Sequence, residues 1–158
     1  MERELRIQIE EAILRSLIHD LLQDGYCIEV GVDGERDLVF STDPIAIFDA
    51  ATGVDETKLY VRPFGKKNVA EILLVFGNDG YDLIADYNTS LEGVLARTDE
   101  YANDIEEAYH ENPQSVPDIL AASEHIRNWM DERSALLKRL KNAGTASDQD
   151  DAEGAPAP

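Results

Sequence analysis

The sequence predicts an α+β fold, in which about five mainly antiparallel strands form one sheet and an N-terminal helix and two C-terminal helices pack on it. Three observations support this prediction. A helical apolar period occupies residues 2–24, short alternating segments separated by turn residues fill 26–87, and helical periods return after residue 90. We expect a single domain over residues 1–143 and a disordered acidic tail at 144–158.

Residues 2–24 predict an amphipathic helix with a wide apolar face. Apolar side chains recur at steps of three and four from Leu5 to Leu22, which is the spacing of one side of an α-helix. Gly25 follows at the position where a left-handed residue commonly ends a helix. Because the apolar face is wide, we expect other elements to cover it on more than one side.

Five strands are predicted between residues 26 and 87. Asp33–Gly34 favours a two-residue hairpin turn, and Asn78–Gly80 predicts a second turn. Because most of the strands are linked as hairpins, we expect an antiparallel sheet. The predicted strands are Tyr26–Val32, Asp37–Ser41, Lys58–Arg62, Val69–Phe76 and Tyr81–Tyr87.

Three further helices are predicted. Asp43 is a candidate N-cap for a short helix at Pro44–Ala51, which has proline in its first position. After the sheet, a helix is expected at Ser90–Glu111, with Ser90 as its N-cap. The last helix is expected over about 117–142, with Gly144 after it.

The charge composition limits the classes of partner. Fourteen Lys and Arg face 33 Asp and Glu, so the formal net charge is −19. This charge disfavours direct binding to nucleic acid or to an anionic membrane, because both require a cationic face, and it favours basic protein partners. Solubility or adaptation to salt is the alternative explanation. No segment is apolar enough to span a membrane, and a cytoplasmic protein is expected.

No group of residues predicts catalysis, a cofactor or a metal site. The three histidines lack metal-ligand spacing, and neither a nucleophile elbow nor a glycine-rich phosphate loop occurs. The single cysteine, Cys27, excludes an intramolecular disulfide and is expected to be a small buried side chain. Acid pairs near turns are possible general acid–base groups, so an enzyme is the third hypothesis after two non-catalytic ones.

The acid is concentrated just before the last helix. Residues 88–112 hold seven acids and only one base, Arg97. The candidate partner-binding residues there are Asp99, Glu100, Asp104, Glu106, Glu107 and Glu111. Four of them stack along one side of the predicted helix, and this acidic ridge consists of Glu100, Asp104, Glu107 and Glu111. The ridge has the form of a row of phosphates presented to a basic cleft; the alternative is a solvated outer face.

The last predicted helix carries a candidate oligomer interface together with several Lys and Arg residues. Two interpretations stay open. The helix packs on the acidic helix and pairs its cations with the ridge, or its apolar residues form a helical seam between two copies of the chain. The candidate interface residues are Trp129, Met130, Leu136, Leu137 and Leu140.

The run Phe76–Tyr87, preceded by the long apolar first helix, resembles a family of small acidic proteins from phages and other mobile elements. The resemblance covers about residues 1–112 and implies no catalytic residues. It implies a genetic setting in which small acidic proteins often inhibit host defence, among them anti-CRISPR and anti-restriction proteins that imitate nucleic acid.

Two hypotheses of function follow. In the first, the chain is a non-catalytic inhibitor from a phage or mobile element, and its acidic ridge docks like a DNA mimic on a basic nucleic-acid-binding surface of a host defence protein. In the second, the chain is an accessory or structural module that oligomerises through its last helix, and its acidity serves solubility or salt adaptation only.

Overall fold

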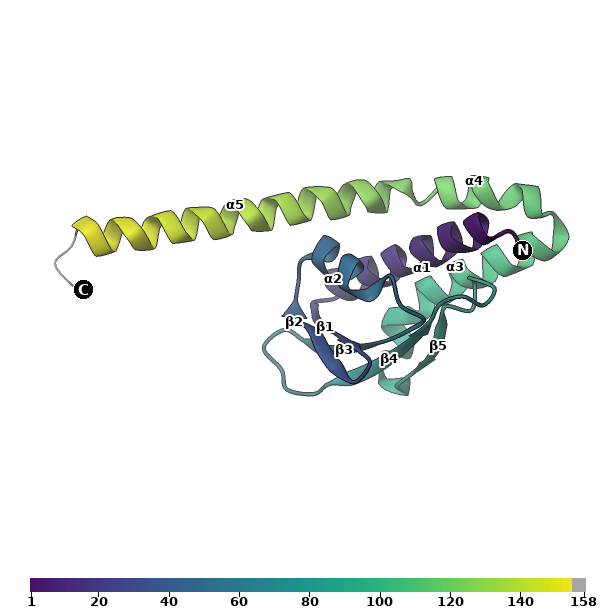
Figure 1. Cartoon of the computed structure of the whole chain (residues 1–158), viewed down its shortest axis with the longest axis horizontal. Helices are drawn as coiled ribbons and strands as arrows, with labels where there is room; N and C mark the ends of the chain where they lie inside the picture. Colours follow the sequence, from purple (N-terminus) through teal and green to yellow (C-terminus); the bar gives the residue numbers. More distant parts are fainter. Residues whose placement is uncertain (155–158) are drawn as a thin grey trace.

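The computed structural model is an antiparallel sheet with helices packed on one of its faces, which confirms the predicted α+β class (Figure 1). The structure describes the backbone of residues 1–154 and the side chains of residues 1–143. The elements are, in chain order, α1 (Arg3–Gln23), β1 (Tyr26–Val32), β2 (Glu35–Ser41), α2 (Pro44–Ala51), β3 (Glu56–Pro63), β4 (Ala70–Val75), β5 (Ile84–Tyr87), the 3-10 turn η1 (Thr89–Leu91), α3 (Glu92–Glu111), the 3-10 turn η2 (Pro113–Ser115), α4 (Val116–Ala121) and α5 (Glu124–Gly154).

The sheet has the strand order β2-β1-β3-β4-β5, and each neighbouring pair is antiparallel. The predicted hairpin turn is present, with Asp33 at φ 52° and Gly34 at φ 76°. Two consecutive left-handed residues are what a tight hairpin between right-twisted strands requires. Alternate residues of the three central strands enter the core, namely Ile28, Val30, Leu59, Val61, Ile72 and Leu74.

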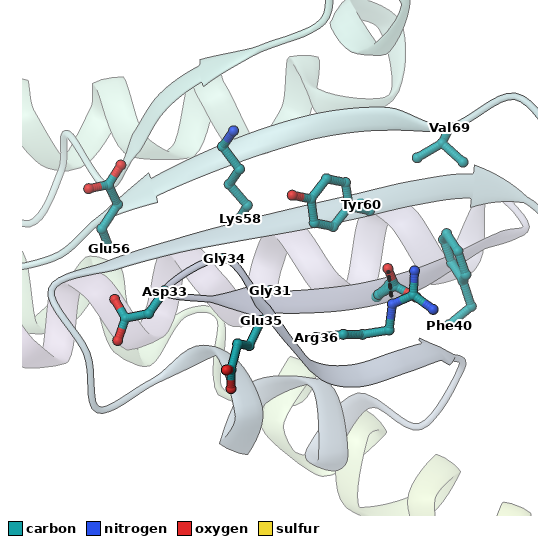
Figure 2. A pocket seen from close by; sticks show the side chains of 11 residues that line it. Gly31, Asp33, Gly34, Glu35, Arg36, Phe40, Glu56, Lys58, Tyr60 and Val69 are labelled. Carbon is teal, nitrogen blue, oxygen red and sulfur yellow. Dashed lines mark ion pairs between the residues drawn. The ribbon is translucent and has the colours of Figure 1, made fainter.

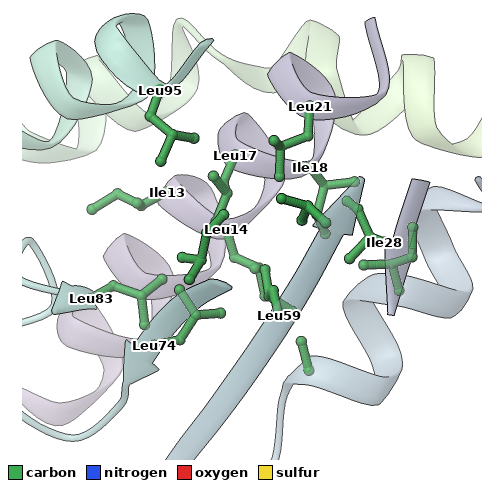
Figure 3. Close-up of a cluster of buried hydrophobic side chains, with 14 of the residues drawn as sticks. Ile13, Leu14, Leu17, Ile18, Leu21, Ile28, Leu59, Leu74, Leu83 and Leu95 are labelled. Carbon is green, nitrogen blue, oxygen red and sulfur yellow. The ribbon is translucent and has the colours of Figure 1, made fainter. Parts of the chain in front are cut away.

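Helix α1 is the centre of the hydrophobic core. Its apolar residues Leu14, Leu17 and Leu21 are fully buried, and Figure 3 shows them between Leu95 of α3 on one side and Leu59 of the sheet on the other. This arrangement confirms that the wide apolar face is covered from two sides. Leu, Arg and Glu also favour the helix intrinsically, so local preference and packing agree.

The segment that carries the family resemblance makes a tight contact with α1. The backbone N–H of Gly77 donates to Oε2 of Glu10 over 2.7 Å, and Arg6 Nη1 lies 3.2 Å from Oε1 of the same carboxylate. Gly80 has φ 89°, and a Cβ there would lie 3.1 Å from the carbonyl oxygen of Arg6 and from Cγ2 of Ile9. The two glycines are therefore explained by backbone conformation and close packing. Because this turn packs on α1, β5 starts at Ile84, later than predicted.

Three expectations about the C-terminal half need correction. No side chain caps α3, which follows the 3-10 turn Thr89–Leu91, so Ser90 is not its N-cap. The helix expected over 117–142 is broken between Ala121 and Glu124, where the Ser123 hydroxyl donates to the carbonyl of Leu120 and accepts from the Tyr101 hydroxyl.

The third correction concerns the end of the chain. Helix α5 runs to Gly154, past the end expected at about residue 142 and past Gly144. The disordered tail expected at 144–158 stays a prediction, and 155–158 lie outside the described residues. An interior glycine costs a helix about 1 kcal/mol without necessarily ending it. None of the helices in the described part of the chain is long and apolar enough to cross a membrane.

Candidate partner-binding surface

Helix α3 is held against α1 by apolar and polar contacts. Leu95 and Ile105 are buried. Between them, Thr98 is also fully buried, and its hydroxyl lies 3.0 Å from that of Ser16 and donates to Asp20 Oδ2 over 2.8 Å. A buried hydroxyl with specific partners fixes the rotation of the helix about its axis. The side of α3 that carries the acidic ridge therefore faces away from α1.

All four carboxylates of the acidic ridge are exposed. Within residues 1–143, no Lys or Arg side chain forms an ion pair with any of them. The ion pairs found there lie elsewhere and are Arg6–Glu10, His19–Asp20, Arg36–Glu29, Lys58–Glu71 and Arg127–Glu124. Neighbouring ridge residues at helical steps of three and four repel one another, and nothing in the described residues relieves that repulsion.

The two flanking acids are separated from the ridge. Asp99 is half-buried and accepts a hydrogen bond of 2.8 Å from the Tyr87 hydroxyl. This bond, together with burial, raises the pKa of Tyr87 above its usual value. Glu106 is also half-buried and lies near Tyr81, whose pKa is raised by burial first and by nearby carboxylates second. Asp99 thus contacts Tyr87 of the edge strand β5, and Glu106 lies near Tyr81, which precedes that strand. Of the six candidate partner-binding acids, the four of the acidic ridge are the exposed ones.

Arg97 is the one cation of the acidic segment. It is exposed, and it lines a cavity of about 450 Å³ together with Tyr101, Asp118 and Ser123. In a helix, Arg97 follows the same side as the ridge, one turn before Glu100. A single cation at one end of four carboxylates leaves the ridge strongly negative.

Helix α5 packs on α1 and α2, and not on the acidic helix as one interpretation proposed. The Trp129 ring meets His19 of α1 edge-on, with 4.7 Å between the centroids. Arg133 Cζ lies over the Trp129 ring, 5.5 Å from its centroid, and Arg133 Nε donates to the carbonyl of Thr42 over 3.3 Å. The α5 hydroxyl of Ser134 donates to the N-cap carboxylate of α2. Residues 129–134 of α5 thus form a docked segment on α1 and α2. The cation in this segment, Arg133, lies away from the acidic ridge.

The candidate oligomer residues divide into two groups. Met130 is 4% exposed and Trp129 is half-buried against α1, so both belong to the packing of this chain. Leu136 and Leu140 are 46% and 60% exposed, and Leu137 is half-buried. These three leucines follow Ser134, whose hydroxyl contacts the N-cap of α2, and α5 extends beyond the rest of the fold toward its C-terminal end (Figure 1).

No group of three or more His, Cys, Asp or Glu side chains in the described part of the chain is placed to hold a metal ion. Cys27 is buried, as expected, with its sulfur 3.5 Å from the carbonyl oxygen of Arg62.

Sequence analysis missed a groove on the other face of the sheet. Its cavity volume is about 610 Å³, and Glu29, Arg36, Lys58 and Tyr60 are among its lining residues (Figure 2). The signal in the sequence was Glu29, a charged residue in the middle of an otherwise apolar strand. Such a residue is buried only where it has a specific partner, and the partner, Arg36, comes from the next strand.

Comparisons of the chain with protein-family models, with curated proteins and with solved structures give no match. The resemblance of Phe76–Tyr87 to small acidic phage proteins therefore stays an expectation. Function has to be argued from the surfaces of the molecule.

Proposed function

We propose that this chain is a non-catalytic acidic binding protein, and that its acidic ridge docks on a basic nucleic-acid-binding surface of a larger protein and excludes the nucleic acid. One observation carries the proposal. The four carboxylates are exposed on one side of α3 and have no Lys or Arg ion-pair partner within residues 1–143.

The spacing of the ridge suits such a partner. Side chains three or four residues apart on a helix lie about 5–6 Å from one another. This is of the same order as the spacing of phosphates, which recur at about 3.4 Å of axis along one strand. A channel lined with Arg and Lys that grips phosphates would also attract this row. The net charge of −19 would steer the encounter.

The biological setting of the proposal comes from the family resemblance. An acidic protein of a phage or mobile element would gain from blocking a host defence protein that must hold DNA or RNA to act. A DNA-mimic inhibitor of such a defence protein is therefore the form of the proposal that we favour.

Affinity capture from a bacterial lysate, at low and high salt, tests the proposal. The ridge variant Asp104→Lys with Glu107→Lys is compared with a matched control, Asp131→Lys with Glu132→Lys, which makes the same charge change at exposed positions of α5. The wild type and the control should capture the same nucleic-acid-binding protein at low salt and release it at high salt, because exposed charges are screened over about 8–10 Å. The ridge variant should capture none.

Two results would contradict the proposal. One is capture of the same protein by the ridge variant and the wild type. The other is a captured protein that added DNA or RNA fails to elute, because a mimic and the nucleic acid must compete for one surface.

The exposed leucines of α5 favour a second candidate, an accessory module that forms oligomers. Leu136 and Leu140 remain exposed beyond the docked segment, and burial of such residues against a second copy would be favourable. Because Trp129 packs within the chain, a Leu136→Asp with Leu140→Asp variant is the cleaner test. This candidate predicts a dimer by light scattering at high salt that the variant lacks, and a wild-type monomer at all concentrations would exclude it.

A further inference from the structure

The two faces of the sheet differ in what covers them. Helices α1 and α2 lie on one face, over the apolar residues of the central strands. Figure 2 views the other face, where α1 lies behind the strands and the side chains of Glu56, Lys58 and Tyr60 lie in front of them. This second face contains the groove of about 610 Å³.

A buried carboxylate lies at the floor of the groove. Glu29 is 6% exposed and lines the cavity. Its Oε2 lies 3.1 Å from Nε of Arg36. Its Oε1 is buried and has no hydrogen-bond partner among the described residues. An ionised carboxylate only accepts hydrogen bonds, and a buried acceptor without a donor is costly, so a ligand that displaces Arg36 from Glu29 would gain an acceptor that has no other partner among the described residues.

The surroundings of Glu29 define the kind of donor that fits. Four carboxylates but only two cations line the groove, the acids being Glu29, Asp33, Glu35 and Glu56 and the cations Arg36 and Lys58. The imbalance favours a cationic ligand. The Arg36 side chain is 63% exposed, so it can move into solvent and give up its place on Glu29 to a cation of the ligand.

Aromatic and aliphatic walls flank this carboxylate. Phe40, Tyr60 and Val69 line the same groove. Tyr60 lies over Gly31, where an added Cβ would come within 3.0 Å of the ring carbon Cε2. The glycine therefore lets the ring lie close to the sheet. Walls of this kind accommodate the aliphatic stem of a lysine or arginine whose charged end reaches an acid.

We propose that the groove binds a lysine or arginine side chain from an extended basic segment of a partner protein, with the Glu29 carboxylate as the acceptor of its charged end. This site lies on β1, β2 and β3, whereas the acidic ridge lies on α3. The proposal therefore goes beyond the function proposed above and does not depend on it.

Calorimetric titration of the full chain with a synthetic peptide of alternating lysine and serine tests the proposal. The titration uses the Asp104→Lys with Glu107→Lys chain, so that the ridge does not contribute and failure of one proposal leaves the other intact. Glu29→Gln should weaken binding about tenfold, because a charge-assisted hydrogen bond is lost. The control Glu132→Gln, an exposed acid of α5 outside the groove lining, should change binding by less than about twofold.

Arg36→Ala separates binding from a structural role of the pair. Removing the cation that shares Glu29 should tighten peptide binding about threefold, whereas a groove that merely needs an intact ion pair would bind more weakly. Because Arg36 is exposed, we expect the Arg36→Ala chain to fold. Its peptide affinity therefore tests the proposal even if Glu29→Gln does not fold. Equal effects of Glu29→Gln and Glu132→Gln, or weaker binding by Arg36→Ala, would overturn the proposal. Spermidine binding as tightly as the peptide would overturn the assignment to a protein segment.

Discussion

Glu10 and Asp20 of α1 and the acidic ridge of α3 occupy opposite environments. Glu10 on α1 is 3% exposed and bonds both Arg6 and the backbone of Gly77. Asp20 on α1 accepts from Thr98 and lies beside His19. The acidic ridge on α3 is exposed and lacks an ion pair within residues 1–143. Glu10 and Asp20 therefore stabilise the fold through specific partners. The acidic ridge makes no ion pair of this kind within the described residues.

The comparison predicts its largest effect at Glu10. Glu10→Ala leaves the Arg6 guanidinium and the Gly77 N–H without their acceptor, so the free energy of unfolding should fall by about 3 kcal/mol. Chemical denaturation measures this change. Glu4→Ala, an exposed acid in the first turn of the same helix, serves as the control, and its change should stay below about 0.5 kcal/mol. Equal effects of the two variants would break the comparison.

A smaller effect is expected where the β4–β5 turn meets α1. Gly80→Ala forces a side chain onto a left-handed residue and against Arg6 and Ile9, and it should lower the free energy of unfolding by about 2 kcal/mol. Gly93→Ala is the matched control, because nothing lies within 4 Å of a Cβ there. In helix α3 that change should stabilise the protein by about 0.5–1 kcal/mol. Thermal unfolding of both variants shows whether the opposite signs hold.

The third prediction concerns Asp99, the acid of α3 that is partnered. Tyr87→Phe removes its hydrogen bond and should cost about 1 kcal/mol at neutral pH. The folded-state pKa of Tyr87 is raised above 10.0 by that bond and by burial. The stabilisation is therefore fully present below the unfolded-state pKa and is lost as the pH rises through the folded-state value. Denaturation from pH 7 to pH 11 should show the difference between wild type and variant shrinking at the alkaline end; a constant difference would contradict the assignment.

The smallest effect on stability is expected at the ridge itself. Asp104→Lys with Glu107→Lys removes repulsion between like charges and breaks no ion pair within the described residues, so the free energy of unfolding should change by less than about 0.5 kcal/mol. The double substitution should raise the free energy of unfolding slightly at low salt, and this difference should disappear at high salt. A loss above about 2 kcal/mol would mean that the ridge carries a structural contact after all.

Local chemistry was sufficient to predict most of the fold. The hairpin turn at Asp33–Gly34 and the capped helix at Pro44–Ala51 depend on neighbouring residues alone, and both are present. The break between α4 and α5 was not predictable from local sequence, because Ser123 at the break hydrogen-bonds Tyr101 of α3, which is a tertiary contact. The pairing of Glu29 with Arg36 likewise depends on strand register.

For the acidic ridge too, local sequence predicts one part of the result and tertiary contacts decide the other. Helical spacing was enough to place Glu100, Asp104, Glu107 and Glu111 along one side of α3. That these four residues form no ion pair within residues 1–143 depends on where α5 docks, which is set by the contacts of Trp129 and Ser134 with α1 and α2. Those contacts are made between elements far apart in the sequence, and no local pattern reports them.

Displacement of labelled nucleic acid from the captured partner tests the role of the ridge most directly. At low salt, the wild type and the Asp131→Lys with Glu132→Lys control should displace the label at the same concentration. The Asp104→Lys with Glu107→Lys variant should need at least about tenfold more protein. Displacement by this variant at the wild-type concentration would contradict the assignment of the ridge as the binding surface.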